Sequence, residues 1–557
     1  MKTIFKNIAL ATAIIAATSS CDDVLDINDT STFGDIAVWS TQDNADAYIT
    51  AAYKTFNDQS GLLVRDRYYD NYSDLMKSPY WWNYPFNRAL LEQSTISKGQ
   101  SSLFDCWNDV YGRIKRTNQM LNDLDRYGQK WGHEWYTIRR AEGRFCNAIN
   151  YFFLARVYGG VVLRTDHSGG AGLLDDGQFE QDRNRARISE EETYKYILDE
   201  LAWAAENLPE EWPAAWTGRA TKSIVYAFIS RIALYAKKWD VAAEAAEKCA
   251  KYYTLVDDYK KLFDVNSDQD NSKEIIFGIK GQKSVVKNAF DADYRPFGDR
   301  LVYNTKTYAM AVPTAELVDM YEFKDGSKFE WSTYKSKHAD PYTDREVRFH
   351  ATVLYNGAKW ENRTIQTYIG GMDEFQAFES QTDADGHTVT GYYLRKYLQE
   401  GNSGFDTDGS YNTDIVIRYG EVLLNKAEAY AMLDRIPEAL DALNEVRERA
   451  KLPAKNIKDA MTLDAFMELL RHERCVELAG EGFRIWDLRR WRLAETVING
   501  KNVHGHKITK MSSGRFSYQT VDADGGKKRI FLPHFYYMSL PSSELSQNKL
   551  CKDNPIW

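Results

Sequence analysis

The residues best suited to chemistry in this sequence form an aromatic cluster. The run Tyr80-Trp81-Trp82-Asn83-Tyr84 follows neither a helical nor an alternating pattern, so its rings cannot all face one core. Indole and phenol rings stack on the C–H faces of sugars, and the nearby Arg67 and Asp70 can bind sugar hydroxyl groups. The cluster predicts a carbohydrate site in which Trp81, Trp82 and Tyr84 contact the ligand. The alternative is that two of these rings only anchor the loop to the scaffold.

Motifs for catalysis or metal binding are incomplete. His133-Glu134 and His472-Glu473 begin like the zinc motif H-E-x-x-H, but Thr137 and Val476 replace the second histidine. The sequence contains no G-x-S-x-G motif and no Walker-type phosphate loop. A pair of hydrolytic carboxylates would be hidden among the 80 acidic residues, so a secreted glycan-active hydrolase stays open as an alternative. We expect a non-catalytic protein with no metal and no cofactor.

Three D-x-D-G segments resemble the start of a calcium loop. They are Asp383/Asp385, Asp406/Asp408 and Asp522/Asp524. A calcium loop of the EF-hand type also needs a further oxygen ligand before the glycine and a bidentate glutamate after it. We therefore interpret these segments as turns.

The composition favours a large globular protein that does not bind nucleic acid. Of the 557 residues, 43% are hydrophobic and 27% are charged, which is enough for a packed core. The net charge of -9 argues against nucleic acid, because binding phosphates needs a concentrated basic surface. Aromatic residues reach 14%, so we expect several rings on surfaces or in clefts.

The N-terminus is typical of a secreted lipoprotein. Lys2 and Lys6 precede a short apolar run from Ile8 to Ala17, and small residues then lead to Cys21. Residues 1–20 are predicted to be a signal peptide, and Cys21 is predicted to carry the lipid. An ordinary signal peptide or a membrane anchor is the alternative. Five cysteines at wide spacings remain, and we expect them to be buried free thiols: Cys106, Cys146, Cys249, Cys475 and Cys551.

Apolar residues at three- and four-residue steps predict a series of helices. One apolar stripe runs from Ile415 and Val416 through Tyr419 and Val422 to Tyr430. The expected helices are Asn44 to Phe56, Leu103 to Asp125, Trp135 to Tyr158, Ser189 to Asn207, Ile224 to Lys237, Val241 to Tyr252, Ile415 to Tyr430, Ile436 to Val446 and Leu463 to Ala479.

Two of the expected helix pairs resemble tetratricopeptide repeats. Each pair has a tight turn, but Tyr235 to Ala243 is one residue shorter than Tyr430 to Ala439, which indicates a degenerate repeat. Because each helix buries only one stripe, the pairs must stack on one another.

We predict a mainly α fold in which tetratricopeptide-like helix pairs support an irregular, loop-rich ligand-binding subdomain. After the signal peptide, residues 21–557 are expected to form one unit. The helical scaffold covers about 40–255 and 412–492, the inserted subdomain covers about 256–411, and a loop-rich region covers 493–557. Short β-like runs such as Glu274 to Ile279 and Ala351 to Tyr355 fall inside the insertion.

Several segments, in order along the chain, resemble the SusD/RagB family of nutrient-binding lipoproteins. They include Trp107 to Asn118 (W-x-x-x-Y-x-x-I-x-x-x-N), Glu142 to Gly160, Arg418 to Ala429, Arg471 to Trp491 and the ending Asn554-Pro555-Ile556-Trp557. Ala141, Cys146, Ser539 and Ile556 depart from the family pattern. We expect Arg474, Glu477, Glu481, Arg484 and Asp487 to form a semi-buried ion-pair network that fixes the last helix, rather than a catalytic cluster.

The resemblance implies a function in nutrient capture. It implies that the aromatic loop and the segment before Pro313, which holds Tyr294, Arg295 and Phe297, supply glycan contacts, with Trp331 and Trp360 as lesser candidates. It also implies a protein that is lipid-anchored in the outer membrane, facing the exterior, and that works with a SusC-like TonB-dependent barrel. A non-catalytic protein-interaction scaffold is a further alternative.

Overall fold

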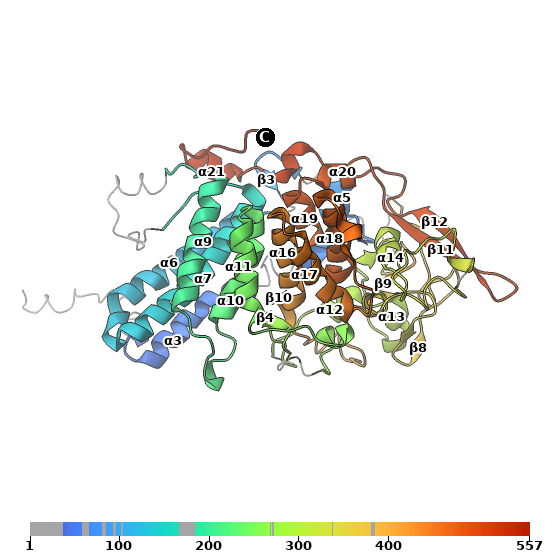
Figure 1. The fold of residues 1–557 in the computed structure, drawn as a ribbon, viewed down its shortest axis with the longest axis horizontal. Coiled ribbons are helices and arrows are strands. Elements are labelled where there is room, and N and C mark those ends of the chain that lie inside the picture. Colours follow the sequence, from blue (N-terminus) through green and yellow to red (C-terminus); the bar gives the residue numbers. More distant parts are fainter. Residues whose placement is uncertain are drawn as a thin grey trace, which may run out of the picture.

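The computed structural model describes residues 37–557 apart from 58–65, 81–84, 93–95, 102–103, 166–183, 268, 270–271, 284, 337 and 380–384. The predicted mainly α fold is confirmed. Figure 1 shows a row of helices on the left and in the centre, and a loop-rich region with short strands on the right. The scaffold helices are α3 (Gln42–Thr50), α4 (Lys54–Asn57), α6 (Trp107–Tyr127), α7 (His133–Tyr158), α9 (Glu190–Asn207), α10 (Lys222–Tyr235), α11 (Trp239–Ala250), α16 (Tyr419–Met432), α17 (Ile436–Arg449), α18 (Leu463–Leu478) and α19 (Arg484–Arg490).

The long helix α7 forms the middle of the first half of the scaffold. Its side chains from Phe145 to Tyr158 are almost all buried, so neighbours surround it on every side. Gly143 allows α6 to approach closely, since a Cβ at this position would lie 2.7 Å from side-chain atoms of Met120 and Leu121. The next helix, α9, begins with the predicted capping box, in which Ser189 and Glu192 satisfy each other's backbone N–H groups.

The two helix pairs α10–α11 and α16–α17 close with the same turn. Lys237 and Asp434 both adopt a left-handed backbone, with φ of 54° and 60°. The following N–H groups bond to carbonyls five residues back, from Lys238 to Ala233 and from Arg435 to Tyr430, each at 2.9 Å. The matching residues are therefore Ala233 and Tyr430, and the predicted difference in spacing is wrong: the two turns have equal length.

The prediction that one helix runs from Ile415 to Tyr430 is wrong at its start. Ile415 and Val416 belong to strand β10 (Asp414–Arg418), which pairs antiparallel with β4 (Ile275–Ile279), and α16 begins only at Tyr419. The β-branched run fits a pleated ladder better than a helix. This ladder joins the start of the loop-rich region to the scaffold, because α16 follows β10 directly in the chain and α10 contacts β4.

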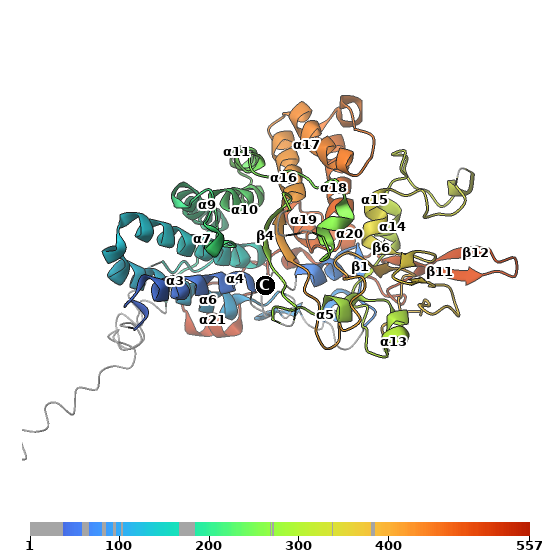
Figure 2. The same cartoon turned by 90° about the horizontal axis from the view of Figure 1, so that it is seen from below.

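The loop-rich region contains short helices and two-stranded pairs. Figure 2 shows α13, β11 and β12 at the end of the molecule away from α3 and α6. The remaining elements are β1 (Met76–Lys77), α5 (Pro85–Glu92), β2 (Ile96–Ser97), β3 (Gln100–Ser101), α12 (Phe290–Tyr294), α13 (Phe297–Tyr303), β5 (Val312–Pro313), α14 (Ala315–Met320), α15 (Val347–Thr352), β6 (Val353–Leu354), β7 (Lys359–Trp360), β8 (Arg363–Thr364), β9 (Tyr393–Leu394), α20 (Ala494–Ile498), β11 (His504–Lys510), β12 (Phe516–Asp522) and α21 (Ser542–Gln547). No helix in the described ranges is long and apolar enough to cross a membrane.

Candidate functional site

The predicted aromatic loop is only partly described by the structure. Trp81, Trp82 and Tyr84 lie outside the described residues, as does the side chain of Arg67. Tyr80, immediately before the loop, is buried, and its carbonyl accepts a hydrogen bond of 2.6 Å from Nδ2 of Asn87. The start of the loop is therefore fixed to the protein.

Tyr80 lies beside two segments that are distant in sequence. Its ring centroid is 6.4 Å from that of Tyr308. The turn at Asp385 and Gly386 also lies beside Tyr80. A Cβ on Gly386 would be 3.6 Å from the Tyr80 hydroxyl and 2.6 Å from the carbonyl oxygen of Thr307. Glycine permits both this close approach and the left-handed φ of 85°.

Helix α13 joins the same group through an aromatic contact. The half-buried Phe297 stacks on His387, with 3.6 Å between ring centroids and 21° between ring planes. One turn later, Arg300 forms an ion pair of 2.9 Å with Asp385. Leu301 on the same helix is 60% exposed. We call the group formed by Tyr80, Phe297, Arg300, Tyr308 and His387 the α13 surface.

The α13 surface combines rings with polar groups. A half-buried ring offers a face or edge for the C–H groups of a sugar, and an arginine beside it can hydrogen-bond to hydroxyl groups. No motif in the sequence marks Arg300 or His387 as a ligand contact. The only signal near His387 is the D-x-D-G segment at Asp383/Asp385.

Three predicted contact residues are buried and serve the scaffold. Asp70 accepts hydrogen bonds from the backbone N–H groups of Gly480, Gly482 and Arg484, at 2.9, 3.2 and 3.3 Å. Burial raises the pKa of this carboxyl to about 7, although the three N–H groups act in the opposite direction. Tyr294 is only 2% exposed. Asp70 and Tyr294 therefore lie in the interior rather than facing a ligand.

Arg295 is the third of these residues, and it is fully buried. It forms ion pairs with Asp299 at 2.8 Å, Glu361 at 3.0 Å and Asp291 at 3.2 Å. Trp360 is also buried, and its Nε1 donates to Asp299 at 3.0 Å. This cluster fixes α12 and α13 against strand β7, so it positions Phe297 from the interior of the protein.

The structure also places the D-x-D-G segments, Trp331 and the cysteines. Asp385 and Asp406 lie in turns, as predicted, whereas Asp524 is buried and pairs with Lys77 and Arg529 at 2.9 and 2.8 Å. Trp331 is half-buried, and its Nε1 donates to Asp319 at 2.9 Å. The five cysteines that the structure describes are buried and free, as predicted: Cys106, Cys146, Cys249, Cys475 and Cys551. Cys21 lies outside the described residues.

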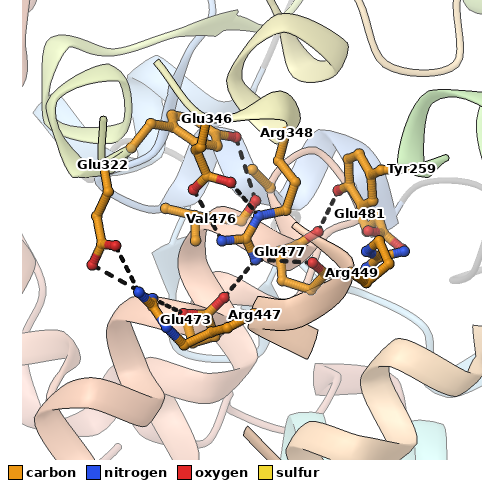
Figure 3. Close-up of polar contacts among 12 residues, drawn as sticks. Tyr259, Glu322, Glu346, Arg348, Arg447, Arg449, Glu473, Val476, Glu477 and Glu481 are labelled. Carbon is orange, nitrogen blue, oxygen red and sulfur yellow. Dashed lines mark hydrogen bonds and ion pairs between the residues drawn. The ribbon is translucent and has the colours of Figure 1, made fainter. Parts of the chain in front are cut away.

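The prediction of an ion-pair network around the last long helix is confirmed in part (Figure 3). All five predicted residues form ion pairs, but only Arg474 and Asp487 pair with each other, and the other three pair with residues from elsewhere in the chain. Glu477 of α18 contacts Arg418 at 2.7 Å, Arg348 at 3.0 Å and also Arg449. One turn earlier, Glu473 pairs with Arg348 at 2.5 Å. Burial alone would raise the pKa of the Glu477 carboxyl, but the three arginines outweigh it and hold that pKa well below its usual range.

The network holds together segments that are distant from one another along the chain. Its arginines come from α15, the end of β10 and the last turn of α17, while α18 supplies the glutamates. Arg474 pairs with Asp487 at 2.8 Å in the same region, and Arg484 pairs with Asp74 at 2.8 Å. The network connects the helical scaffold to the loop-rich region through Arg348 of α15.

The mainly helical fold with tetratricopeptide-like pairs places the chain among helical-repeat proteins, and comparison with known proteins narrows this class. The SusD family matches residues 273–557, and a family described as "Starch-binding associating with outer membrane" matches residues 23–234. The chain belongs to the SusD family.

Proteins similar to this chain match it over nearly its full length. SusD-like protein P38 of Formosa agariphila is 24% identical over 519 residues, covering 89% of this chain and 94% of that protein. A SusD-like protein of Bacteroides fragilis superposes with a TM-score of 0.78 at 24% identity, covering 94% of this chain and 98% of the other. A structure described as a laminarin-binding SusD-like protein gives a TM-score of 0.64 at 18% identity, with coverage of 93% and 100%. At these identities the structural likeness establishes the fold.

Proposed function

We propose that this protein captures a glycan at the cell surface and delivers it to a TonB-dependent outer-membrane transporter. The observation that carries the proposal is the stacked pair of Phe297 and His387 beside Tyr80, from which the Trp81–Tyr84 run continues. Rings from three distant segments meet beside the buried Arg295 ion-pair cluster, and a site held in place in this way loses less entropy when a sugar binds. The family description and the laminarin-binding relative support a carbohydrate ligand.

The place of action follows from the family and the N-terminal sequence. Cys21 would carry the lipid after removal of residues 1–20, and the mature protein would lie on the outer face of the outer membrane. The barrel partner is part of the proposal because of the family resemblance. The protein would present the glycan to the barrel unchanged, as a binding protein rather than an enzyme.

A binding panel tests the proposal. The mature chain is titrated calorimetrically with purified polysaccharides and oligosaccharides of different linkage, and each mixture is assayed for new reducing ends. We expect saturable binding to at least one glycan, with reducing ends no higher than in a heat-killed control. Glycan cleavage would support the hydrolase alternative, and failure to bind any glycan would support a protein-interaction scaffold.

The aromatic loop is tested with the ligand that this panel identifies. The double variant Trp81→Ala, Trp82→Ala should bind more weakly and melt at the same temperature as the wild type. Tyr294 is left intact because its ring is buried, so that its removal would affect folding. Unchanged affinity would exclude the loop from the site, and a large fall in melting temperature would show that these rings belong to the core.

A further inference from the structure

A second pocket lies far along the sequence from the α13 surface. It has a volume of about 270 Å³ and is lined by α9, the turn after α10, α19 and the C-terminal segment. Seven of its lining residues are arginine or lysine, and two are glutamate. A basic pocket in a chain of net charge -9 creates a local positive potential that the composition as a whole does not provide.

Arg489 is the most unusual residue of this pocket. It is only 5% exposed, and its Nη2 donates to the carbonyl oxygen of Tyr536 at 2.6 Å. Within the described ranges, its Nε and Nη1 atoms have no hydrogen-bond partner, and neither has Nε1 of the neighbouring Trp486. A buried guanidinium with unsatisfied N–H groups and no carboxylate is energetically costly, so an acceptor in the pocket would stabilise it.

The guanidinium of Arg156 adds a second positive charge close to that of Arg489. The guanidinium carbons of Arg156 and Arg489 lie 4.2 and 5.1 Å from the ring centroid of Trp486. Burial lowers the pKa of Arg489 to about 10, and Arg492 and Arg156 shift it in the same direction, although Tyr537 opposes them. The positive charges in the pocket therefore repel one another.

Nearby carboxylates do not neutralise Arg489. Glu428 and Asp487 both pair with Arg490, the latter at 2.8 Å. Glu190 accepts a hydrogen bond from the hydroxyl group of Tyr537. Arg489 thus lies among other cations and acids that are engaged elsewhere, and the remaining acid of the pocket lining, Glu191, is exposed to solvent. An incoming anion would supply the missing acceptor.

We propose that this pocket binds a small oxyanion, namely a phosphate, sulfate or carboxylate group, either free or as the acidic substituent of a sugar. The guanidinium of Arg489 keeps two unsatisfied nitrogens, Nε and Nη1, and each can donate a charge-assisted hydrogen bond to an oxygen of such an anion. The pocket volume exceeds that of several water molecules, and the rings of Tyr194, Tyr235 and Trp486 leave an apolar wall for a carbon skeleton. The proposal does not depend on glycan binding at the α13 surface, because the two sites share no residue.

Equilibrium dialysis tests this proposal with three probes: labelled inorganic phosphate, labelled sulfate and glucuronate. We expect saturable binding of at least one probe by the wild-type chain, at least tenfold weaker binding by Arg489→Gln, and wild-type binding by Lys458→Gln. Lys458 is exposed and lies outside the pocket, so it controls for the loss of one positive charge. Binding of glucuronate but not of the inorganic anions would identify an acidic sugar as the source of the oxyanion.

Folding is checked separately by circular dichroism and thermal melting. The bound anion should raise the melting temperature of the wild type above its value in chloride of equal ionic strength, and should not do so for Arg489→Gln. If that variant does not fold, Arg492→Gln replaces it, since this side chain is exposed and lines the pocket, and its affinity should fall several-fold. No saturable binding of any probe at millimolar concentration, or equal affinity in wild type and pocket variant, would overturn the proposal.

Discussion

Arg418 and Glu477 meet in the interior of the protein, with 2.7 Å between Nη1 and Oε1, although they lie 59 positions apart. Replacing Glu477 with glutamine would leave Arg348, Arg418 and Arg449 without their common counter-charge. Because breaking a buried ion pair from one side is strongly unfavourable, we expect a loss of about 3–5 kcal/mol in the free energy of unfolding. Urea unfolding followed by circular dichroism measures this loss.

The matched control for Glu477→Gln is Glu438→Gln. Glu438 pairs with Arg435 at 2.9 Å, but both side chains are more than 40% exposed. An exposed pair contributes little, so this variant should lie within about 0.5 kcal/mol of the wild type. Equal effects of the two substitutions would mean that the network contributes no special stability.

Stability should depend on pH through His506. Burial lowers the pKa of this imidazole to about 3, while the unfolded chain keeps a value near the ordinary one of about 6.5. Below that pH the unfolded state takes up a proton that the folded state does not, so the free energy of unfolding falls as the pH drops. The contribution approaches about 1.4 kcal/mol per pH unit.

The variant His506→Gln should remove this part of the dependence. We expect its free energy of unfolding to change less between pH 6 and pH 5 than that of the wild type, as measured by urea unfolding at each pH. His133→Gln is the control, since this side chain is exposed at the start of α7 and should leave the slope unchanged. If His506→Gln and the wild type had the same slope, protonation of His506 would not be linked to unfolding.

Phe297 should contribute directly to glycan affinity. Replacing it with alanine removes the ring that stacks on His387, and we expect a loss of about 1–2 kcal/mol, or roughly tenfold in Kd or somewhat more. Calorimetric titration with the glycan found in the panel measures the change. Trp216→Ala is the control, because that half-buried ring also lies beside an arginine, with the guanidinium carbon of Arg219 4.2 Å from its centroid, but is outside the α13 surface. Loss of affinity in both variants, or in neither, would contradict the assignment.

Cys21 should determine where the protein resides. The variant Cys21→Ala cannot be lipidated, so we expect it in soluble fractions, whereas the wild type should stay with outer membranes after a high-salt wash. Fractionation followed by immunoblotting measures the distribution. Retention of the variant in the washed membranes would show that another feature of the chain holds it there.

Much of the helical scaffold is predictable from the sequence because its signals are local. The capping box of Ser189 and Glu192 is formed by residues three apart, and the stripe of the helix from Ile436 onward needs only the helical period. The odd number and wide spacing of the five cysteines likewise predict free thiols rather than a disulfide framework, and the structure confirms this. The prediction of secondary structure fails where the conformation of a residue depends on a partner distant in sequence. Ile415 is an example, since it pairs with Gly278 in a strand.

The sequence by itself determined the mainly α fold, the helix pairs and the resemblance to a family, since these depend on periodicity and on motifs that occur in order along the chain. Only the tertiary structure decided which polar and aromatic side chains face outward. Arg295 and Phe297 are two residues apart, yet one is enclosed by three carboxylates and the other stacks on His387, 90 residues further on. Burial is the sum of contacts with residues distant in sequence, and these contacts exist only once the chain has folded.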